Sequence, residues 1–353
     1  MENKKILIIR LSALGDTIHT IPLASALKEN YPSTTIGWIV EDKAKQFVKN
    51  NPVVDKTYVI PRKKWRKRGF SLRNFKEFLA IIRRIRREKY DIVIDTQQLF
   101  KSSIIMLFLN IKRKITHKDG REFSWLFANE FVKSDRKQFD LKYHVVKRNL
   151  DFAKYLGISD PKVKFELPLL DIHGFEKIKG MLCTLDQSKP TIALAPATTW
   201  VNKHWLESYW SKIIEEFSDK SNIIITGSKI DEPLVKRIID EANVGGVYNF
   251  CGKTNLLELA QLYKSVNVVI SPDSGSAHIA WAVNKPATVT VFSATSKDRT
   301  GPFGDNNYSI GPEIDCSPCM KRKCRLKNEQ NICRAAVKPE QIINIVNNIL
   351  HLS

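Results

Sequence analysis

The feature of this sequence that most constrains its fold is the regular alternation of short apolar runs with longer amphipathic segments. In the first half, strand-like runs at 4–10, 34–40, 56–61, 90–97 and 113–117 alternate with helical patterns at 17–30, 42–50, 72–89 and 101–110. The second half repeats the alternation, with strand-like runs within 189–199, 221–228, 244–252, 267–283 and 286–294 and an amphipathic helix at 204–219. This rhythm predicts an α/β fold, in which mostly parallel sheets carry helices on both faces.

The chain has 353 residues, which exceeds one ordinary core and suggests two domains. The segment 157–180 mixes proline and charge without clear periodicity, so we interpret it as the linker between them. We predict domains at 1–165 and 166–337, followed by an amphipathic terminal helix at 338–353, for which packing back on the first domain is one alternative. Two doubly wound domains would leave a central cleft between facing strand ends, where ligands bind by default.

Asp16 lies in the stretch RLSALGDTIHT, at 10–20, directly after the first strand-like run. One interpretation is structural, because aspartate is a favoured residue at the N-cap of a helix. The other is functional, because open α/β sheets bind their ligands at the carboxyl ends of the strands. These residues alone leave both interpretations open.

Three strand-end loops of the second half carry the groups expected around a nucleoside diphosphate. In SPDSGSAHIAWAV, at 271–283, small residues open a helix and let backbone N–H groups approach an anion. The loop 195–205 adds hydroxyl groups and a lysine, and 226–234 adds two acids that can accept from a ribose. The candidates are Thr198, Thr199, Lys203, Asp231, Glu232, Asp273, Ser274, Gly275, Ser276 and His278. The structural alternatives are a helix capped by Asp273 or Asp231, a solvated loop lysine and a buried core histidine.

The chain is strongly basic, with 57 Lys and Arg against 37 Asp and Glu and a net charge of +20. This predicts an anionic partner, such as nucleic acid, a phosphorylated glycolipid or an acidic membrane face. The stretch PRKKWRKRGF, at 61–70, places six basic residues around one tryptophan. It suits docking of an anionic acceptor, binding of single-stranded nucleic acid or a solvated loop, and charge alone does not choose.

Four of the six cysteines are clustered near the C-terminus, with the spacing C-x2-C-x4-C-x8-C. They are Cys316, Cys319, Cys324 and Cys333. Such a cluster could hold a structural zinc ion or an iron–sulfur centre, although the spacing matches neither standard zinc pattern. We expect a cytoplasmic protein, because the longest apolar run, at 102–111, is too short to cross a bilayer and the N-terminus lacks the apolar region of a signal peptide.

Five stretches, in order, resemble the ADP-heptose:lipopolysaccharide heptosyltransferases of glycosyltransferase family 9. They are ILIIRLSALGDTIHTIPL, RKKWRKRGFS, YDIVIDTQQLFKSS, ATTWVNKHW and SPDSGSAHIAWAV, and the resemblance covers nearly the whole chain. The tryptophan-containing basic stretch and the Thr-Thr-x3-Lys-His-Trp block favour the members that add the first heptose, heptosyltransferase I. The cysteine cluster departs from that pattern and is more similar to members that add later heptoses.

The resemblance implies a GT-B fold, two Rossmann-like domains of which the C-terminal one binds the nucleotide sugar, and an inverting reaction that requires no cofactor. It implies that Asp16 is the general base toward a hydroxyl of Kdo, the keto-sugar of the acceptor. Lys203, the hydroxyls of the 195–205 loop and the N–H groups at Ser274–Ser276 would stabilise the departing ADP. Asp273 and His278 would belong to the nucleotide-sugar loop, and Asp231 or Glu232 would hold the ribose.

The resemblance also implies how the acceptor is bound. The acceptor residues would be Arg62, Lys64, Arg66, Lys101 and Arg121. The implied partners are ADP-heptose, Kdo-lipid A and the inner face of the cytoplasmic membrane, contacted peripherally by the basic face with Trp65 and Phe70. Nucleic acid is not expected.

Three alternatives remain at this point. One is an enzyme of the heptosyltransferase II or III type, which acts on an already heptosylated core, and another is the same fold with a different nucleoside diphosphate sugar. The third is a basic nucleic-acid-binding protein with a zinc cluster of four cysteines, which would leave the three strand-end loops unexplained.

Overall fold

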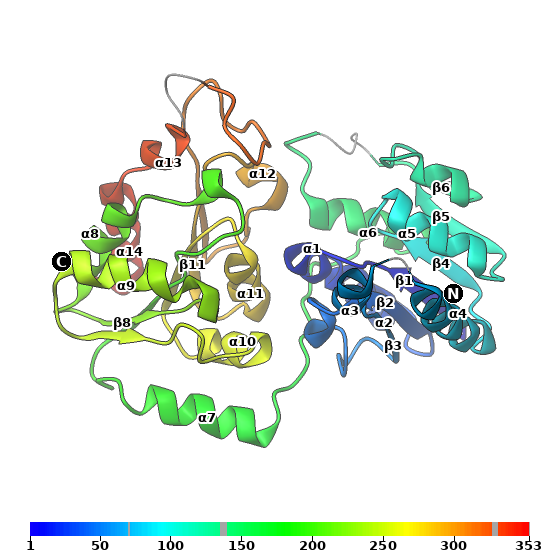
Figure 1. The fold of residues 1–353 in the computed structure, drawn as a ribbon, viewed down its shortest axis with the longest axis horizontal. Helices are drawn as coiled ribbons and strands as arrows, with labels where there is room; N and C mark the ends of the chain where they lie inside the picture. Colours follow the sequence, from blue (N-terminus) through cyan, green and yellow to red (C-terminus); the bar gives the residue numbers. More distant parts are fainter. Residues whose placement is uncertain (70, 135–139, 327–330, 353) are drawn as a thin grey trace. The chain divides into compact units, whose positions relative to one another are not determined.

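The computed structural model describes residues 1–69, 71–134, 140–326 and 331–352. The chain divides into two compact units, Met1–Leu169 and Leu170–Ser353, which are blue to green and green to red in Figure 1. This division falls close to the predicted boundary between 165 and 166. Of the helices in the described residues, none is long and apolar enough to cross a membrane.

The described part of the N-terminal unit contains one six-stranded parallel sheet, in the order β3-β2-β1-β4-β5-β6. Its strands are β1 Lys5–Ile9, β2 Thr35–Glu41, β3 Lys56–Ile60, β4 Ile92–Asp95, β5 Arg113–His117 and β6 Glu130–Val132. Its helices are α1 Leu14–Ile18, α2 Ile21–Asn30, α3 Arg62–Arg68, α4 Leu72–Arg87, α5 Phe100–Ser103 and α6 Val145–Tyr155, with shorter turns η1 Lys45–Phe47, η2 Ile104–Phe108 and η3 Ser124–Phe127. Residues 6–9 of β1 are fully buried, as parallel sheets with two covered faces require.

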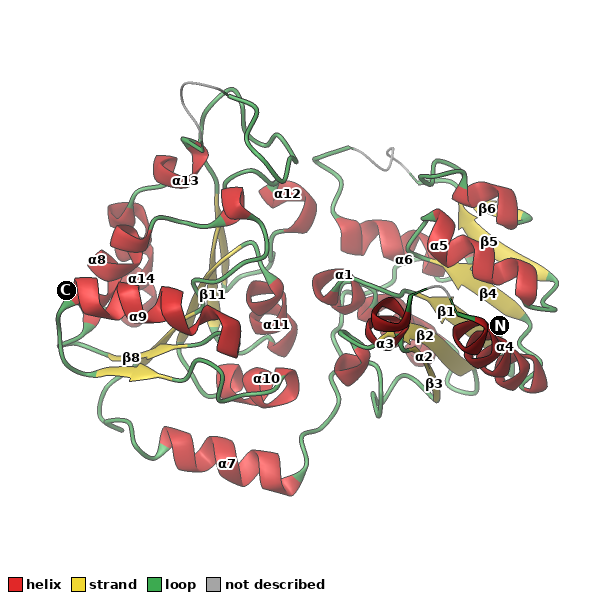
Figure 2. Cartoon of the chain, in the orientation of Figure 1, coloured by secondary structure: helices red, strands yellow, loops and turns green. Residues whose placement is uncertain are grey.

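The C-terminal unit repeats this architecture, with helices around the strands of its sheet (Figure 2). Its described strands have the order β12-β11-β10-β7-β8-β9. They are β7 Thr191–Leu194, β8 Asn222–Ile225, β9 Val247–Asn249, β10 Val268–Pro272, β11 Ala287–Val291 and β12 Asn307–Ile310. The helices are α7 Ile172–Leu182, α8 Glu207–Phe217, α9 Glu232–Ala242, α10 Leu256–Lys264, α11 Gly275–Val283, α12 Lys297–Thr300, α13 Cys333–Ala336 and α14 Pro339–Leu350, with turns η4 Val201–Lys203 and η5 Lys229–Asp231. The prediction of two doubly wound α/β units is confirmed.

In each sheet the chain first adds strands on one side of the first strand and then on its other side. As a result β1 lies between β2 and β4, and β7 lies between β8 and β10. Ligands of open α/β sheets bind outside the carboxyl ends of the strands at such a switch point. The loops after β1 and β4 carry Asp16 and Lys101, and those after β7 and β10 carry Lys203 and Asp273. The topology therefore places the main candidate residues where each sheet is built to bind a ligand.

The terminal helix α14 belongs to the core of the C-terminal unit. Ile342 and Val346 are fully buried there, in one cluster with Trp205 and Trp210, and α14 packs against α8. The Trp205 indole N–H also donates to the carbonyl of Val337, at 2.8 Å. The helix thus buries its apolar residues Ile342 and Val346 in the core of its own unit.

Several predicted elements differ in detail from the observed ones. The predicted helix at 17–30 is two helices, α1 and α2, and the predicted helix at 42–50 is only the turn η1. The expected loop at 61–70 contains helix α3, because Pro61 suits a helix start and the arginines and lysines after it are good helix formers. The expected linker at 157–180 contains the start of α7, whose first turn is capped by the Asp171 carboxylate.

Candidate active site

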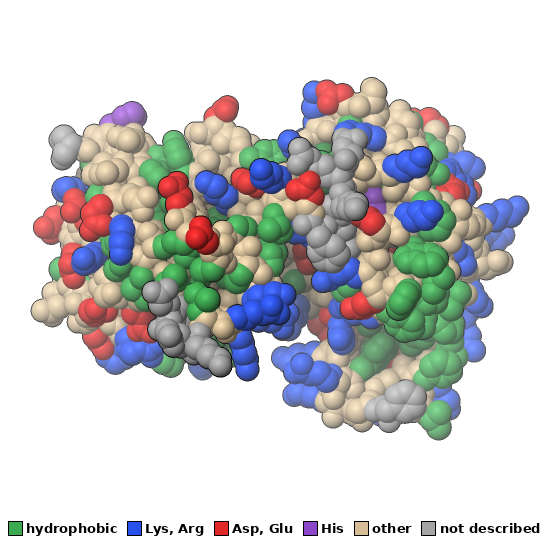
Figure 3. Space-filling view, turned by 90° about the horizontal axis from the view of Figure 1, so that it is seen from above, with side chains coloured by type: hydrophobic (Ala, Val, Ile, Leu, Met, Phe, Trp, Pro, Cys, Tyr) green, Lys and Arg blue, Asp and Glu red, His purple; other side chains and the backbone are tan. Residues whose placement is uncertain are grey.

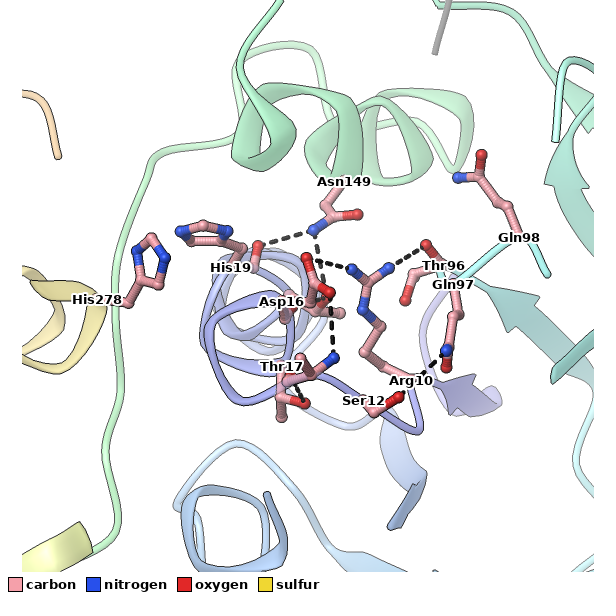
Figure 4. A network of polar contacts seen from close by, with 12 residues as sticks. Arg10, Ser12, Asp16, Thr17, His19, Thr96, Gln97, Gln98, Asn149 and His278 are labelled. Atoms are coloured by element: carbon pink, nitrogen blue, oxygen red, sulfur yellow. Dashed lines mark hydrogen bonds and ion pairs between the residues drawn. The ribbon is translucent and has the colours of Figure 1, made fainter. Parts of the chain in front are cut away.

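Asp16 lies in the first turn of α1 and is oriented by two neighbours (Figure 4). The N-cap residue is Ala13, so Asp16 is the third helical residue, and its Oδ2 accepts the Ala13 N–H at 3.1 Å. Its Oδ1 is paired with an Arg10 nitrogen at 2.9 Å. The Asp16 side chain remains 43% exposed, whereas that of Arg10 is 11% exposed. The carboxylate is therefore held in place from within the unit and is still open to a ligand.

The loop after β4 supports this arrangement. Arg10 donates to the carbonyl of Thr96 at 2.5 Å, and the Gln97 side-chain oxygen accepts the Leu11 N–H at 2.8 Å. The fully buried Asp95 accepts the N–H groups of Gln97 and Gln98, at 3.0 and 3.2 Å. Burial raises the pKa of the Asp95 carboxyl above its ordinary value. Asp95 thus organises one loop, which in turn fixes the loop that carries Asp16.

Two of the predicted acceptor residues meet at one buried carboxylate, Glu41. The Glu41 Oε1 accepts from Arg62 at 2.8 Å and from Lys101 Nζ at 3.2 Å. Lys101 also donates to the Ser12 hydroxyl at 2.9 Å, within the Asp16 loop. Because a carboxylate between two cations fixes both of them, Glu41 connects the basic helix α3 with the loop after β1.

The other predicted acceptor residues lie elsewhere on the N-terminal unit. Lys64 is paired with Glu77 on α4, at 3.1 Å, while Arg66 and Arg121 are exposed. Trp65 is half-buried, donates to Glu77 at 2.8 Å and packs edge-on against Phe78, at 6.4 Å between ring centroids.

The expected membrane contact through Trp65 stays a prediction, and the side chain is partly buried where it packs between α3 and α4. Phe70, the other residue of that prediction, lies outside the described residues.

Asp273, at the carboxyl end of β10, is the centre of a buried polar cluster. It is in contact with Lys203 Nζ at 2.5 Å, the Thr295 hydroxyl at 2.7 Å and His278 Nε2 at 3.5 Å. Burial alone would raise the pKa of Asp273, but the contacts with His278 and Lys203 outweigh it and hold the pKa well below its usual value. Asp273 is therefore ionised at neutral pH and compensates the charge of Lys203.

The cap of helix α11 is Ser274 and not Asp273. The Ser274 hydroxyl accepts the Ser276 N–H at 3.2 Å, so this first-turn donor is already used. His278 is buried, as a core histidine would be, and it also contacts the Asp273 carboxylate. The burial agrees with the structural interpretation of His278, and a role in binding a nucleotide sugar stays a prediction.

The loop after β7 presents two cations on one indole ring. Lys203 Nζ lies 4.7 Å from the centre of the Trp200 ring, and the Arg322 guanidinium lies 5.3 Å from it. His204 Nε2 contacts the carbonyl of Thr198 at 2.9 Å and thereby closes the loop. Burial lowers the pKa of His204, so this histidine is neutral at pH 7. Thr199 is exposed at the tip of the loop.

The two acids of the third loop differ in how they are used. Asp231 Oδ2 accepts from the N–H and the hydroxyl of Ser228, at 2.8 and 2.6 Å, so it serves as a turn cap. Glu232 is the first residue of α9, and its carboxylate lies beside Gly252, where a Cβ would approach Oε1 to 3.1 Å. Asp231 is thus used within its own turn, whereas Glu232 is exposed, and which of the two holds a ribose stays a prediction.

The cysteine segment packs against the loops after β7 and β11. The Asn202 side chain donates to the carbonyl of Lys321, and the Met320 N–H donates to the carbonyl of Ala294 at 2.8 Å. Cys333 is buried, and burial, followed by the nearby Cys319, Cys316 and Cys324, raises the pKa of its thiol.

Among the described residues, no group of three or more His, Cys, Asp or Glu side chains is placed to hold a metal ion. The observed arrangement therefore does not fit a preformed metal site, and metal binding by the cysteines stays a prediction. The contacts show that the segment around Met320 and Lys321 packs against Asn202 and Ala294.

Sequence reasoning missed several residues that complete these clusters. They are Arg10, Glu41, Gln97, Trp200, Thr295 and Arg322. A signal existed for Arg10, because an arginine at the end of an otherwise apolar strand needs a polar partner. Thr295 and Arg322 had no such signal, since only the folded chain brings them to the loops after β10 and β7.

Comparison with known proteins adds three findings. The family model described as glycosyltransferase family 9 (heptosyltransferase) matches residues 78–330. Lipopolysaccharide heptosyltransferase 1 of Pseudomonas aeruginosa is 24% identical over 96% of this chain and 96% of its own length.

Two solved proteins share the fold. A glycosyltransferase family 9 protein of Veillonella parvula superposes with a TM-score of 0.81 at 19% identity, over 100% of this chain and 98% of its own. The Escherichia coli heptosyltransferase solved with ADP gives a TM-score of 0.74 at 23% identity, over 98% and 99%.

Proposed function

Because this chain belongs to glycosyltransferase family 9, the heptosyltransferases, we propose that it transfers a heptose from ADP-heptose to a Kdo hydroxyl of the lipopolysaccharide inner core. The observation that carries the proposal is the family match, which extends over parts of both units. The relative named heptosyltransferase 1 supports the first-heptose reaction, and the E. coli structure with ADP supports the nucleotide.

In the proposed reaction Asp16 is the general base. The acceptor hydroxyl gives its proton to the Asp16 carboxylate while its oxygen attacks the anomeric carbon of the heptose. The bond from that carbon to the ADP oxygen breaks, the electron pair leaves with ADP, and the configuration inverts. Arg10 and the Ala13 N–H hold the carboxylate, and its exposed side gives the hydroxyl access.

The leaving ADP gains negative charge, which positive groups of the C-terminal unit would stabilise. Lys203 and Arg322 lie on Trp200, and the N-terminus of α11 adds the N–H groups of Ser274 and Gly275. Asp273 positions Lys203 and touches no reacting atom in this scheme. Glu232 would accept hydrogen bonds from the ribose. No step uses a metal ion.

The acceptor would be bound by the basic residues of the N-terminal unit. Arg62 and Lys101, held together by Glu41 beside the Asp16 loop, would meet the phosphate and carboxylate groups of Kdo-lipid A. Lys64, Arg66 and Arg121 would extend this contact. Since the acceptor is anchored in lipid, we also propose that the protein is cytoplasmic and attaches peripherally to the inner membrane.

The test is ADP release by the purified protein with ADP-heptose as donor and Kdo-lipid A as acceptor, in the presence of EDTA. A heptosylated acceptor is run in parallel. We expect turnover on the Kdo-terminated acceptor and little on the heptosylated one. Activity only on the heptosylated acceptor would replace the first-heptose assignment with the heptosyltransferase II type, and loss of activity with EDTA would contradict the metal-free scheme.

A further inference from the structure

Five exposed hydrophobic side chains gather on neighbouring elements of the N-terminal unit, and we call them the apolar face. They are Phe100 on α5, Leu107 on η2, and Phe123, Trp125 and Leu126 at η3, with exposed fractions between 37% and 69%. The elements pack together, since the Phe100 ring lies 5.5 Å from that of Phe127, and η2 adjoins η3. Contiguous apolar surface of this kind marks an interaction site more often than chance.

The backbone at the apolar face is also unusual. Glu122 and Phe123 both have left-handed conformations, with φ of 53° and 56°. Such a conformation is rare for a bulky residue and destabilises the chain locally. Here it directs Phe123 outward, at 69% exposure, while the next residue, Ser124, is buried. The fold therefore holds an aromatic ring in solvent at a conformational cost, which fits a role outside the core.

A basic border adjoins the apolar face at Leu107. The side chain of Leu107 lines a hollow together with four cations, Arg86, Lys89, Lys112 and Lys114. The hollow also includes Asp91, whose carboxylate already accepts from the N–H of Lys5 at 2.8 Å and is paired with Lys4. Figure 3 shows hydrophobic side chains gathered on the N-terminal unit with lysines and arginines around them. The surroundings of the apolar face are therefore positively charged.

We propose that the apolar face docks the protein on a bilayer containing anionic lipids, with the basic border in contact with the lipid phosphates. The proposal deepens the proposed function and rests on it, because that function requires a lipid-anchored acceptor. Aromatic and aliphatic side chains bind at the boundary between headgroups and acyl chains, and lysines near an anionic leaflet add attraction. A second copy of the chain fits less well, because a two-fold contact would set two basic borders against each other.

The first test is co-sedimentation of the full chain with phosphatidylcholine vesicles that contain or lack phosphatidylglycerol. We expect binding to the anionic vesicles and weak binding to the neutral ones. The double variant Trp125→Ser/Leu126→Ser should lower the partition coefficient about tenfold, because two side chains no longer leave water. The control Leu169→Ser/Ile172→Ser removes two side chains of higher exposure, 88% and 65%, and should change nothing. An equal loss in both variants, or none in the first, would overturn the proposal.

The second test addresses the basic border. Lys112→Glu/Lys114→Glu should abolish the preference for anionic vesicles, whereas Lys212→Glu/Lys285→Glu, an identical change of charge in the C-terminal unit, should preserve it. If the protein sediments as a dimer without vesicles and the variant with Trp125→Ser and Leu126→Ser is a monomer, the apolar face is a subunit interface and the proposal is wrong.

Vesicle binding needs neither donor nor acceptor sugar, so it can be separated from the proposed function. ADP release on a Kdo acceptor without acyl chains should be equal in the wild type and in Trp125→Ser/Leu126→Ser. Vesicle binding without any ADP release would refute the transferase and leave the docking face standing. ADP release without vesicle binding would refute the docking face and leave the transferase standing.

Discussion

Asp16 and Asp273 both follow a central strand at the switch point of their sheet, and both are paired with a cation. Their surroundings nevertheless differ. The side chain of Asp16 is 43% exposed beside Arg10, whereas that of Asp273 is 4% exposed between Lys203, Thr295 and His278. Similar local sequences, a strand followed by a helix start with an aspartate, have thus produced an open carboxylate in one unit and an enclosed one in the other.

This difference separates a reactive group from a positioning group. A general base must reach the proton that it removes, and only an accessible carboxylate can do so. An enclosed carboxylate whose pKa is held low is a poor base, but it can fix a lysine that would otherwise be buried without compensation. Within the proposed function, the chemistry would therefore fall to Asp16 and the positioning of Lys203 to Asp273.

The largest effect is expected for Asp16→Asn. The amide cannot accept the proton of the acceptor hydroxyl, so turnover should fall by roughly 10²- to 10⁴-fold. ADP affinity should be unchanged, because Asp16 lies in the other unit from the proposed nucleotide loops. ADP release and calorimetric ADP binding measure the two quantities.

Asp160→Asn is the matched control for this variant. It removes an exposed aspartate of the same unit that is paired with Lys162, and its turnover should equal that of the wild type. Normal turnover in Asp16→Asn would remove Asp16 from the mechanism.

The next effect concerns stability. Asp273→Asn leaves Lys203, 15% exposed, without its counter-charge and should lower the free energy of unfolding by about 3 kcal/mol. Asp16→Asn removes the carboxylate partner of Arg10, which is 11% exposed but still donates to the Thr96 carbonyl, and because Asp16 itself is 43% exposed this variant should cost less than Asp273→Asn. Urea unfolding followed by tryptophan fluorescence compares the two variants. If Asp16→Asn were the more destabilised, the division into a reactive and a positioning carboxylate would have to be reversed.

The sequence predicted the parts of this comparison that depend on local pattern. The alternation of strands and helices placed Asp16, Lys203 and Asp273 at strand ends, where the parallel sheets have them. It could not predict that Thr295 contacts Asp273 or that Arg322 lies on Trp200, because these contacts join segments far apart in the chain. Short edge strands such as β6 and β12 were also missed, since three or four residues carry too little periodicity.

The exposure of the Asp16 and Asp273 carboxylates could not be predicted from the sequence either. Whether an aspartate after a strand is open or enclosed depends on what the rest of the unit packs over it. Helix α3 shows the same limit. Its six basic side chains suggested a loop, but in the folded unit some of them are paired with Glu41 and Glu77, and the segment is helical.

The smallest effect is the pH dependence of the Asp273 contribution. The contacts with His278 and Lys203 hold the pKa of Asp273 in the folded protein below its ordinary value, so folding favours the ionised form. The stabilisation is therefore complete above the unfolded pKa and is lost as the pH falls through it toward the lower folded pKa. The difference in unfolding free energy between the wild type and Asp273→Asn should be constant near about pH 5 and shrink below about pH 4.

Urea unfolding of both proteins at several pH values in this range measures that difference. Lys203 and His278, which contact Asp273 in the wild type, are present in both proteins, so the comparison isolates the carboxylate. A difference for Asp273→Asn that grew on acidification would mean that the enclosed carboxylate is not held ionised by its neighbours, and the contrast with Asp16 would lose its electrostatic basis.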